Sequence, residues 1–425
     1  MYKQTTLKNG LKVVTSHMPG MESVSIGLWI GVGGRFEEKR LCGISHLIEH
    51  MLFKGTTSRT ANALKEAIEG VGGTFNAFTG ETLTCYLVKL PSYCAKLGLD
   101  ILSDMALHPT LDPAELEKEK FVVCEEIKMY MDQPGQHVFE ILAETMWPNH
   151  PLGRPVAGYI PIVKNLKRQD LVNFRERFYQ PANMAIVAAG KLKKEDILSF
   201  AKDTFFMPSS RKTFSCSMYK SRPGGMKTAF FRKNTKQAHL ALGFHSVKRS
   251  HRLRYAALLL HIILGGNMSS RLFDRLREEK GLCYEISSSV KYHRETGAFL
   301  IHAGVDNAKL VEAAGEIIKE LKELKKNSVT RDELARAKEY TRGQLLLALE
   351  DTGSRMTWLG ERIMSEGKAP SVKEIFRKIE RVTAGDIDEI TRMIFNEKNL
   401  NFATIGPASS SERKKAKETL RGLRR

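Results

Sequence analysis

The chain has 425 residues, of which 42% are hydrophobic, so it is long enough for two or more domains with large cores. Its 67 basic and 48 acidic residues give a formal net charge of +19. This charge is spread along the chain and no zinc-finger or RNA-recognition signature accompanies it, so we expect a solvated basic surface, with nucleic-acid binding as a minor alternative. No run of about 20 apolar residues could cross a bilayer, so we expect no membrane partner either.

The N-terminal segment and the cysteines bear on the compartment. Residues 1–10 contain neither an apolar signal segment nor an Arg- and Ser-rich presequence. Six scattered cysteines without a Cys-x-x-Cys pair are typical of reduced thiols. We therefore expect a cytoplasmic prokaryotic protein, although a mature form with its presequence removed would have the same sequence.

The first predicted elements are short strands followed by two helices. Residues 5–15 predict a hairpin, and residues 24–30 predict a strand that the glycines at 31–34 end. A helix is predicted from about 43 to 53 and another over 62–69, where following glycines stop it.

Further elements follow before the midpoint. Alternation and threonine content predict a strand over 81–88, and apolar spacing predicts a helix over 93–107. A long helix opens at Asp112-Pro113 and continues through Tyr130, with proline in its first turn.

The second half of the chain echoes the first. Residues 178–187 and 394–403 each combine a turn, an asparagine and a strand, and both are followed by glycine. The Ser-, Pro- and Gly-rich stretch at 208–225 is the best linker candidate. We predict two homologous α+β halves, with an N-terminal domain at 1–210, a linker at 211–225 and a C-terminal domain at 226–425.

The predicted helix at 43–53 contains the sequence's clearest chemical motif. His46 and His50 are four residues apart and project from one helix face, where two imidazoles can bind one Zn²⁺. Glu49 beside them is suited to hold and deprotonate the water that the ion activates. The order His-x-x-Glu-His is the inverzincin motif. Two histidines at this spacing are also compatible with a metal-free, hydrogen-bonded pair, but a carboxylate among apolar residues needs a partner.

Two further carboxylates lie on the long helix that opens at Asp112. Glu119 and Glu126 are seven residues apart and therefore share a helix face. Either could reach a metal held by the first helix. In the second half, the helix predicted at 255–264 contains His261 but no His-x-x-Glu-His, so we expect one metal site per chain.

In combination, five stretches resemble the pitrilysin/insulinase-type (inverzincin) zinc metallopeptidases, in particular their short, processing-peptidase-like subgroup. The stretches are residues 43–51, 75–79, 122–127, 265–272 and 277–284. The resemblance covers nearly the whole chain. It implies two homologous α/β-sandwich domains, each an antiparallel-rich sheet packed with helices, that close like a clamshell.

The resemblance also assigns roles to residues of this sequence. Glu126 matches the third zinc ligand, and Glu119 matches a glutamate that supports the ligands. Glu125 competes with Glu126, but on a helix it points about 100° away. Arg277 and Tyr284 match an arginine and a tyrosine that complete the site from the C-terminal domain and stabilise the oxyanion.

The function implied is that of a metalloendopeptidase with one Zn²⁺ per chain. Its peptide substrates are oligopeptides or unfolded, presequence-like segments, and Asn76 and Ala77 match the strand edge that holds their backbone. The resemblance implies a homodimer and leaves open a hetero-oligomer with a homologous subunit.

Besides nucleic-acid binding, two alternatives stay open at the level of sequence. A non-catalytic subunit is one, although such subunits typically lack some motif residues and His46, Glu49, His50 and Glu126 are all present. A subunit that needs a homologous partner to bind its substrate is the other.

Overall fold

The computed structural model describes residues 2–207, 214–220 and 224–424 and contains two compact units. Unit 1 comprises Met1–Lys128, Arg154–Ser217 and Leu345–Ser371. Unit 2 comprises Met129–Gly153, Met218–Gln344 and Val372–Arg425. Each unit therefore includes one segment from the other half of the sequence, unlike the continuous domains predicted above. Of the predicted linker and the stretch before it, residues 208–213 and 221–223 lie outside the described residues.

Unit 1 is built on a six-stranded mixed sheet with the order β1-β2-β6-β3-β5-β4. Neighbouring strands are antiparallel except β2 and β6, which are parallel. Among the described residues β4 pairs only with β5, so its outer side is a free edge. The strands are β1 (Lys3–Thr6), β2 (Lys12–His17), β3 (Ser23–Ile30), β4 (Thr74–Thr79), β5 (Thr84–Pro91) and β6 (Met184–Gly190).

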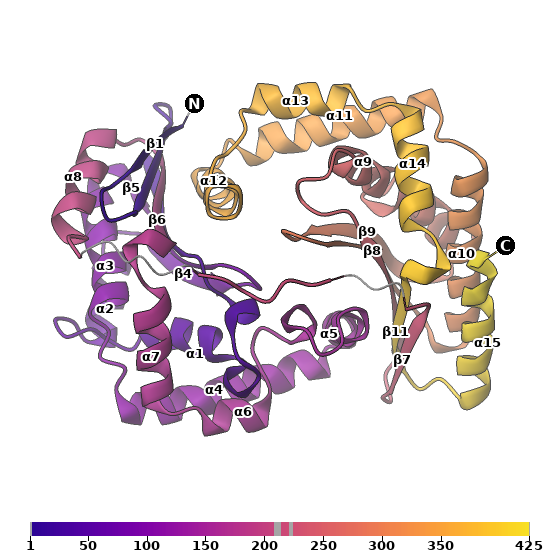
Figure 1. The fold of residues 1–425 in the computed structure, drawn as a ribbon, viewed down its shortest axis with the longest axis horizontal. Helices are drawn as coiled ribbons and strands as arrows, with labels where there is room; N and C mark the ends of the chain where they lie inside the picture. The colour runs from indigo at the N-terminus through magenta and orange to yellow at the C-terminus, as the bar shows by residue number, and fades with distance from the viewer. Residues whose placement is uncertain (1, 208–213, 221–223, 425) are drawn as a thin grey trace. The chain divides into compact units, whose positions relative to one another are not determined.

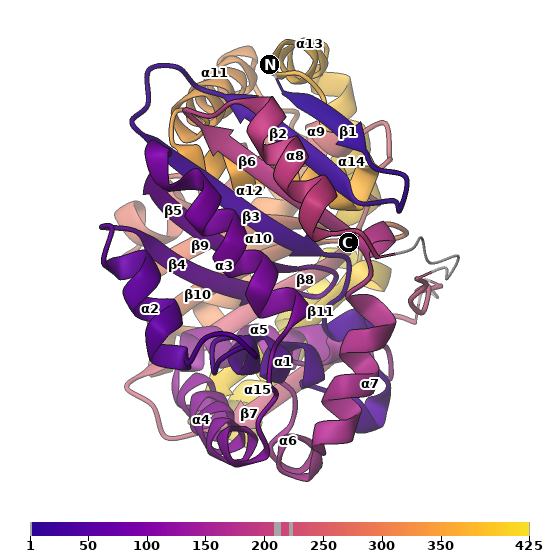
Figure 2. The same ribbon diagram turned by 90° about the vertical axis from the view of Figure 1, so that its left-hand side faces the viewer.

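Helices cover both faces of this sheet. On one face the main core joins Ile26 and Leu28 of β3 to Leu47, Ile48 and Met105, and Figure 2 shows the strands behind α3 and α8. On the other face lies α12 (Thr352–Glu366) (Figure 1). The remaining helices of unit 1 are α1 (Ile44–Leu52), α2 (Ala61–Glu69), α3 (Ala95–Leu107), α4 (Pro113–Asp132, its last residues in unit 2), α6 (Ile160–Asn165), α7 (Arg168–Phe178) and α8 (Lys194–Thr204).

Helix α12 packs closely on the sheet through Trp29. The alternation of β3 turns Trp29 away from Ile26 and Leu28 and into a second core with Met356 and other α12 residues. A Cβ on Gly360 would lie 2.0 Å from Cε2 of the Trp29 ring, so only glycine allows this approach.

Unit 2 repeats the same sheet plan with five strands in the order β7-β11-β8-β10-β9. As in unit 1, one pair is parallel, here β7 and β11, and the others are antiparallel. The strands are β7 (Lys227–Arg232), β8 (Gln237–Ser246), β9 (Cys283–Tyr292), β10 (Gly297–Asp306) and β11 (Leu400–Gly406). The two-domain fold of sheets packed with helices, predicted from sequence, is confirmed.

Helix α5 (Pro134–Met146) packs on one face of the unit 2 sheet through Val138, Leu142 and Met146. The two halves are alike in this respect. Helix α5 follows α4 in the first half of the chain but belongs to unit 2, and α12 follows α11 in the second half but belongs to unit 1. The other helices of unit 2 are α9 (Arg254–Gly265), α10 (Leu310–Lys326), α11 (Arg331–Ala348, its end in unit 1), α13 (Val372–Glu380), α14 (Ala384–Ile394) and α15 (Ser410–Arg421).

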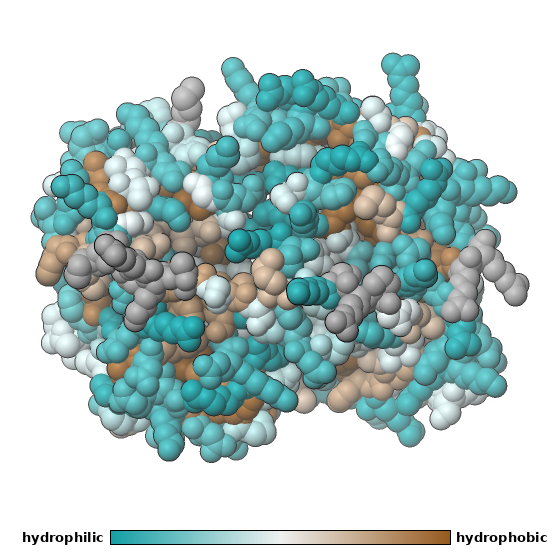
Figure 3. Space-filling view, viewed as in Figure 1, coloured by the Kyte–Doolittle hydropathy of each residue, from teal (hydrophilic) through white to brown (hydrophobic). Residues whose placement is uncertain are grey.

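The surface and the helices of the described residues have two further features. Hydrophilic residues predominate over α13 on the face shown in Figure 3. Within the part of the chain that the structure describes, no helix is both long enough and apolar enough to cross a membrane.

Candidate functional site

A buried carboxylate fixes the start of helix α1. Gly43 precedes the helix with φ +96°, and its N–H donates to Glu37 Oε2 at 2.8 Å. The N–H of Ser45 donates to the other oxygen, Oε1, at 2.9 Å. A Cβ on Gly43 would lie 2.6 Å from the carbonyl oxygen of Ala157. Glu37 thus satisfies amides at the helix start and orients the side chains one turn later.

The structure brings His46, His50 and Glu126 together. One donor atom from each lies within 4.8 Å of the others. Glu126 Oε2 is 3.7 Å from His46 Nε2 and 3.5 Å from His50 Nε2. Glu125 instead pairs with Lys128 at 2.6 Å on a more exposed side of α4. The helix periodicity that favoured Glu126 over Glu125 is therefore seen in the geometry.

Glu119 lies on the same face of α4 as Glu126 and contacts the other ring nitrogen of His50. Its Oε2 is 3.0 Å from His50 Nδ1, and its Oε1 is 2.6 Å from Lys54 Nζ. Burial raises the pKa of Glu119, but the hydrogen bonds from His50 and Lys54 outweigh burial and leave the pKa lowered. An ionised Glu119 holds the proton on Nδ1, so Nε2 of His50 faces Glu126.

The two histidines have opposite shifts of their pKa values. Burial, with the nearby charge of His50, lowers the pKa of His46 to about 4. Burial also acts to lower the pKa of His50, but hydrogen bonds with Glu119 and Glu126 raise it to about 9. His46 is thus neutral at pH 7, and the His50 ring is held between two carboxylates.

Glu49 joins this cluster to the edge strand β4. Thr79 Oγ1 donates to Glu49 Oε2 at 2.5 Å. Burial raises the pKa of Glu49, although the Thr79 hydrogen bond opposes this. Nearer the start of β4, Asn76 Oδ1 accepts from the N–H of Ala77 at 2.8 Å. The sequence analysis missed Thr79; its position two residues after Ala77, on the same strand face, was the available signal.

Arg277 and Tyr284 both belong to unit 2. Arg277 lies in the π-helical segment η6 (Phe273–Glu279), with its guanidinium 4.8 Å from the ring centroid of Phe273. Tyr284, near the start of β9, has an exposed side chain. The Arg277 side chain is 46% exposed, so solvent reaches both side chains.

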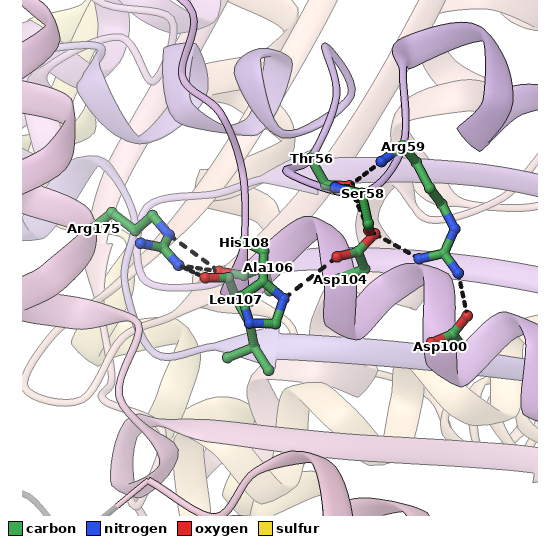
Figure 4. Close-up of polar contacts among 9 residues, drawn as sticks. All are labelled: Thr56, Ser58, Arg59, Asp100, Asp104, Ala106, Leu107, His108 and Arg175. Atoms are coloured by element: carbon green, nitrogen blue, oxygen red, sulfur yellow. Dashed lines mark hydrogen bonds and ion pairs between the residues drawn. The ribbon is translucent and has the colours of Figure 1, made fainter.

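A polar network holds the loop that follows α1 (Figure 4). Asp104 of α3 accepts from Thr56 Oγ1 at 2.7 Å, Ser58 Oγ at 2.8 Å and Arg59 Nη1 at 2.6 Å. Arg175 of α7 donates to carbonyl groups at the end of α3. The network ties α3 and α7 to the chain that leaves the motif helix, and the sequence analysis did not identify it.

Comparison with known proteins places this chain in a family. The family described as Insulinase (Peptidase family M16) matches residues 12–159, and the Peptidase M16 inactive domain matches residues 165–340. The Uncharacterized zinc protease YmxG of Bacillus subtilis (strain 168) is 36% identical over 417 residues, which cover 96% of this chain and 99% of that protein. The chain belongs to the M16 peptidase family. The pitrilysin/insulinase-type family predicted from the motifs is confirmed.

A second relative agrees with this assignment, and two solved structures share the fold. An uncharacterized zinc protease of Mycobacterium leprae (strain TN) is 32% identical over 412 residues, covering 96% of this chain and 92% of the relative. A Helicobacter pylori protease structure has a TM-score of 0.91 and 22% identity, covering 96% of this chain and 99% of that one. A Pseudomonas fluorescens structure titled as a peptidase M16 inactive domain has a TM-score of 0.86 and 18% identity, with coverage of 96% and 98%. At these identities the structures support the fold alone.

Proposed function

We propose that this M16 chain is a zinc-dependent metalloendopeptidase that hydrolyses oligopeptides or unfolded, presequence-like segments. One observation carries the proposal: His46, His50 and Glu126 converge within 4.8 Å beside Glu49, which Thr79 connects to the free edge of β4. The curated relatives named as zinc proteases support it.

The donor set fits zinc. Two imidazole nitrogens and one carboxylate are a usual set for catalytic Zn²⁺, and three protein ligands leave a coordination position open. His46, His50 and Glu126 would hold the ion, and Glu119 would orient His50. When bound, zinc supplies a Lewis acid that polarises the scissile carbonyl and lowers the pKa of water.

The chain's own residues would carry the proton and position the peptide. Glu49 takes a proton from the attacking water at its carboxylate and returns it to the leaving nitrogen. An extended peptide adds to the edge of β4 at Asn76 and Ala77 through main-chain hydrogen bonds, which gives loose sequence specificity. We assign oxyanion stabilisation to Arg277 and Tyr284 on the resemblance.

The experiment compares wild type with Glu49→Gln on a quenched, mixed-sequence oligopeptide library. We expect Glu49→Gln to lower kcat/KM by at least about 100-fold, because a general base contributes that much, while its metal content equals that of wild type. Glu125→Gln, on the exposed side of the same helix as Glu126, is the control and should keep full activity.

The other outcomes each point elsewhere. Cleavage by Glu49→Gln at the wild-type rate would remove Glu49 as the base. Metal in wild type without cleavage by either protein would favour the second candidate function, a non-catalytic or partner-dependent subunit. Wild type without metal would exclude the peptidase. The homodimer and the cytoplasmic location stay predictions. Analytical ultracentrifugation tests the homodimer.

A further inference from the structure

Unit 2 contains a second group of histidine and carboxylate side chains. His239 on β8, Glu285 on β9 and His302 on β10 each offer a donor atom within 4.8 Å of the other two. His239 Nδ1 is 3.2 Å from His302 Nε2. Glu285 Oε1 is 3.6 Å from His239 Nδ1 and 3.9 Å from His302 Nε2. The motif search on the sequence missed this group because its members come from three different strands.

The register of the sheet explains why these side chains meet. Gly304 of β10 is paired with His239 on one side and with Glu285 on the other. His302 lies two residues before Gly304 and so shares its face of the sheet. A Cβ on Gly304 would lie 3.1 Å from Glu285 Oε1 and 3.2 Å from His239 Cε1. Because Gly304 has no side chain, the side chains of His239 and Glu285 can approach each other above it.

Helix α5 covers the group. A Cβ on Gly135, in its first turn, would lie 3.2 Å from His239 Cε1, and the ring of Phe139 lies 5.0 Å from that of His302. The side chains of His239 and His302 are only 12% and 9% exposed, whereas that of Glu285 is 58% exposed. Two imidazoles, one buried and one largely buried, thus lie beneath the helix, and the carboxylate is on the exposed side.

We propose that His239 Nδ1, His302 Nε2 and Glu285 Oε1 bind one divalent transition-metal ion of the zinc type. Two donors on a tetrahedral zinc at about 2.0 Å lie about 3.3 Å from each other, near the observed separations. Burial lowers the pKa of both imidazoles, that of His302 to about 4, so both are neutral at pH 7. This site is additional to the single site that the sequence predicts.

The competing account is a metal-free hydrogen-bonded group. One imidazole would donate to the other, and the Glu285 carboxylate would lie near the first turn of α5, where negative charge is favoured. The two accounts differ in zinc stoichiometry, which is measured without reference to peptidase activity.

The experiment titrates Zn²⁺ alone into the metal-stripped full chain. Elemental mass spectrometry then gives the number of zinc ions bound per chain. We expect two equivalents in wild type and one in the H46Q/H50Q variant, which lacks the α1 ligands. Adding His302→Gln to that variant should remove the remaining equivalent. Circular dichroism checks that each protein is folded.

A second comparison does not depend on a buried substitution. In the H46Q/H50Q background, Glu285→Gln should weaken zinc binding at least about tenfold, since even outer partners of a metal site contribute 10–100-fold. Glu278→Gln, at a residue whose side chain is 60% exposed, is the matched control and should bind as before. No zinc in folded H46Q/H50Q, or equal affinity in the two glutamine variants, would overturn the proposal.

Discussion

At the scale of single residues, Asp104 stabilises the chain that leaves the motif helix. Burial raises the pKa of this carboxyl group, but hydrogen bonds from Thr56, Ser58 and Arg59 outweigh burial and leave the pKa below its usual value. A group with a lowered pKa in the folded state stabilises the protein above its unfolded pKa, and this stabilisation is lost as the pH falls through the folded pKa.

We predict that Asp104→Asn lowers the free energy of unfolding by about 1–3 kcal/mol at pH 7, because buried donors lose a charged acceptor. The difference from wild type should shrink as the pH falls below about 4, where the wild-type carboxyl group becomes protonated. Urea unfolding at a series of pH values measures both effects. Asp100→Asn, which removes the more exposed partner of Arg59, should cost less than about 1 kcal/mol. A difference that is constant with pH, or that grows in acid, would contradict the assignment.

The candidate site could be predicted only where local spacing carries the information. His46 and His50 share a face because they are four residues apart, and helix geometry separates Glu126 from Glu125. Glu37 and Asp104 gave no such signal. Each acts on atoms brought near by loops and turns, which periodicity does not describe.

At the scale of elements, helix α12 depends on a contact that helix propensity opposes. Glycine inside a helix costs up to about 1 kcal/mol relative to alanine. Gly360 nevertheless lies within α12, because a Cβ there would meet the Trp29 ring. Close packing against the sheet thus determines this residue.

We predict that Gly360→Ala destabilises the protein by about 1–3 kcal/mol, as overpacking of a core does. Gly343→Ala is the matched control, because Gly343 lies within α11 and a Cβ there meets nothing within 4 Å. The control should gain about 0.5–1 kcal/mol from helix propensity alone. Thermal unfolding of both variants measures the contrast, and two shifts of the same sign would refute it.

Most elements could be predicted from the sequence, with errors at their ends. The strand expected at 24–30 is β3 (Ser23–Ile30), and the helix opening at Asp112-Pro113 is α4 (Pro113–Asp132). The strand expected at 81–88 is β5 (Thr84–Pro91), shifted by three residues. Residues 74–79 form β4, which local pattern did not predict as a strand because one of its faces is exposed and the other is only half-buried.

At the scale of the whole molecule, the two units exchange helices. The unit that holds the motif helix takes α12 from the second half of the chain, and the unit 2 sheet takes α5 from the first half. Helical periodicity predicts that α5 and α12 have an apolar face, but it does not say which sheet that face will cover. Sequence analysis could therefore predict the helices but not their exchange.

We predict that neither half of the sequence folds cooperatively by itself. Residues 1–217 lack α12, so Trp29, Val14 and Val187 on that face of the sheet would be exposed to water. This fragment should bind a hydrophobic dye and lack a sharp thermal transition, and adding residues 218–425 should restore both properties toward those of the intact chain. A sharp transition in residues 1–217 alone would contradict the prediction.

Because α12 comes from the second half of the chain, unit 1 cannot complete its folding until that helix has been synthesised. Ribosomes add about 5–20 residues per second, so the roughly 150 residues from Ser217 to Ser371 take about 8–30 s to make. His46, Glu49, His50 and Glu126 have all left the ribosome by then, but the sheet beneath them still lacks one of its covering helices. The nascent chain therefore holds the His-x-x-Glu-His motif in an incomplete unit until α12 has been synthesised.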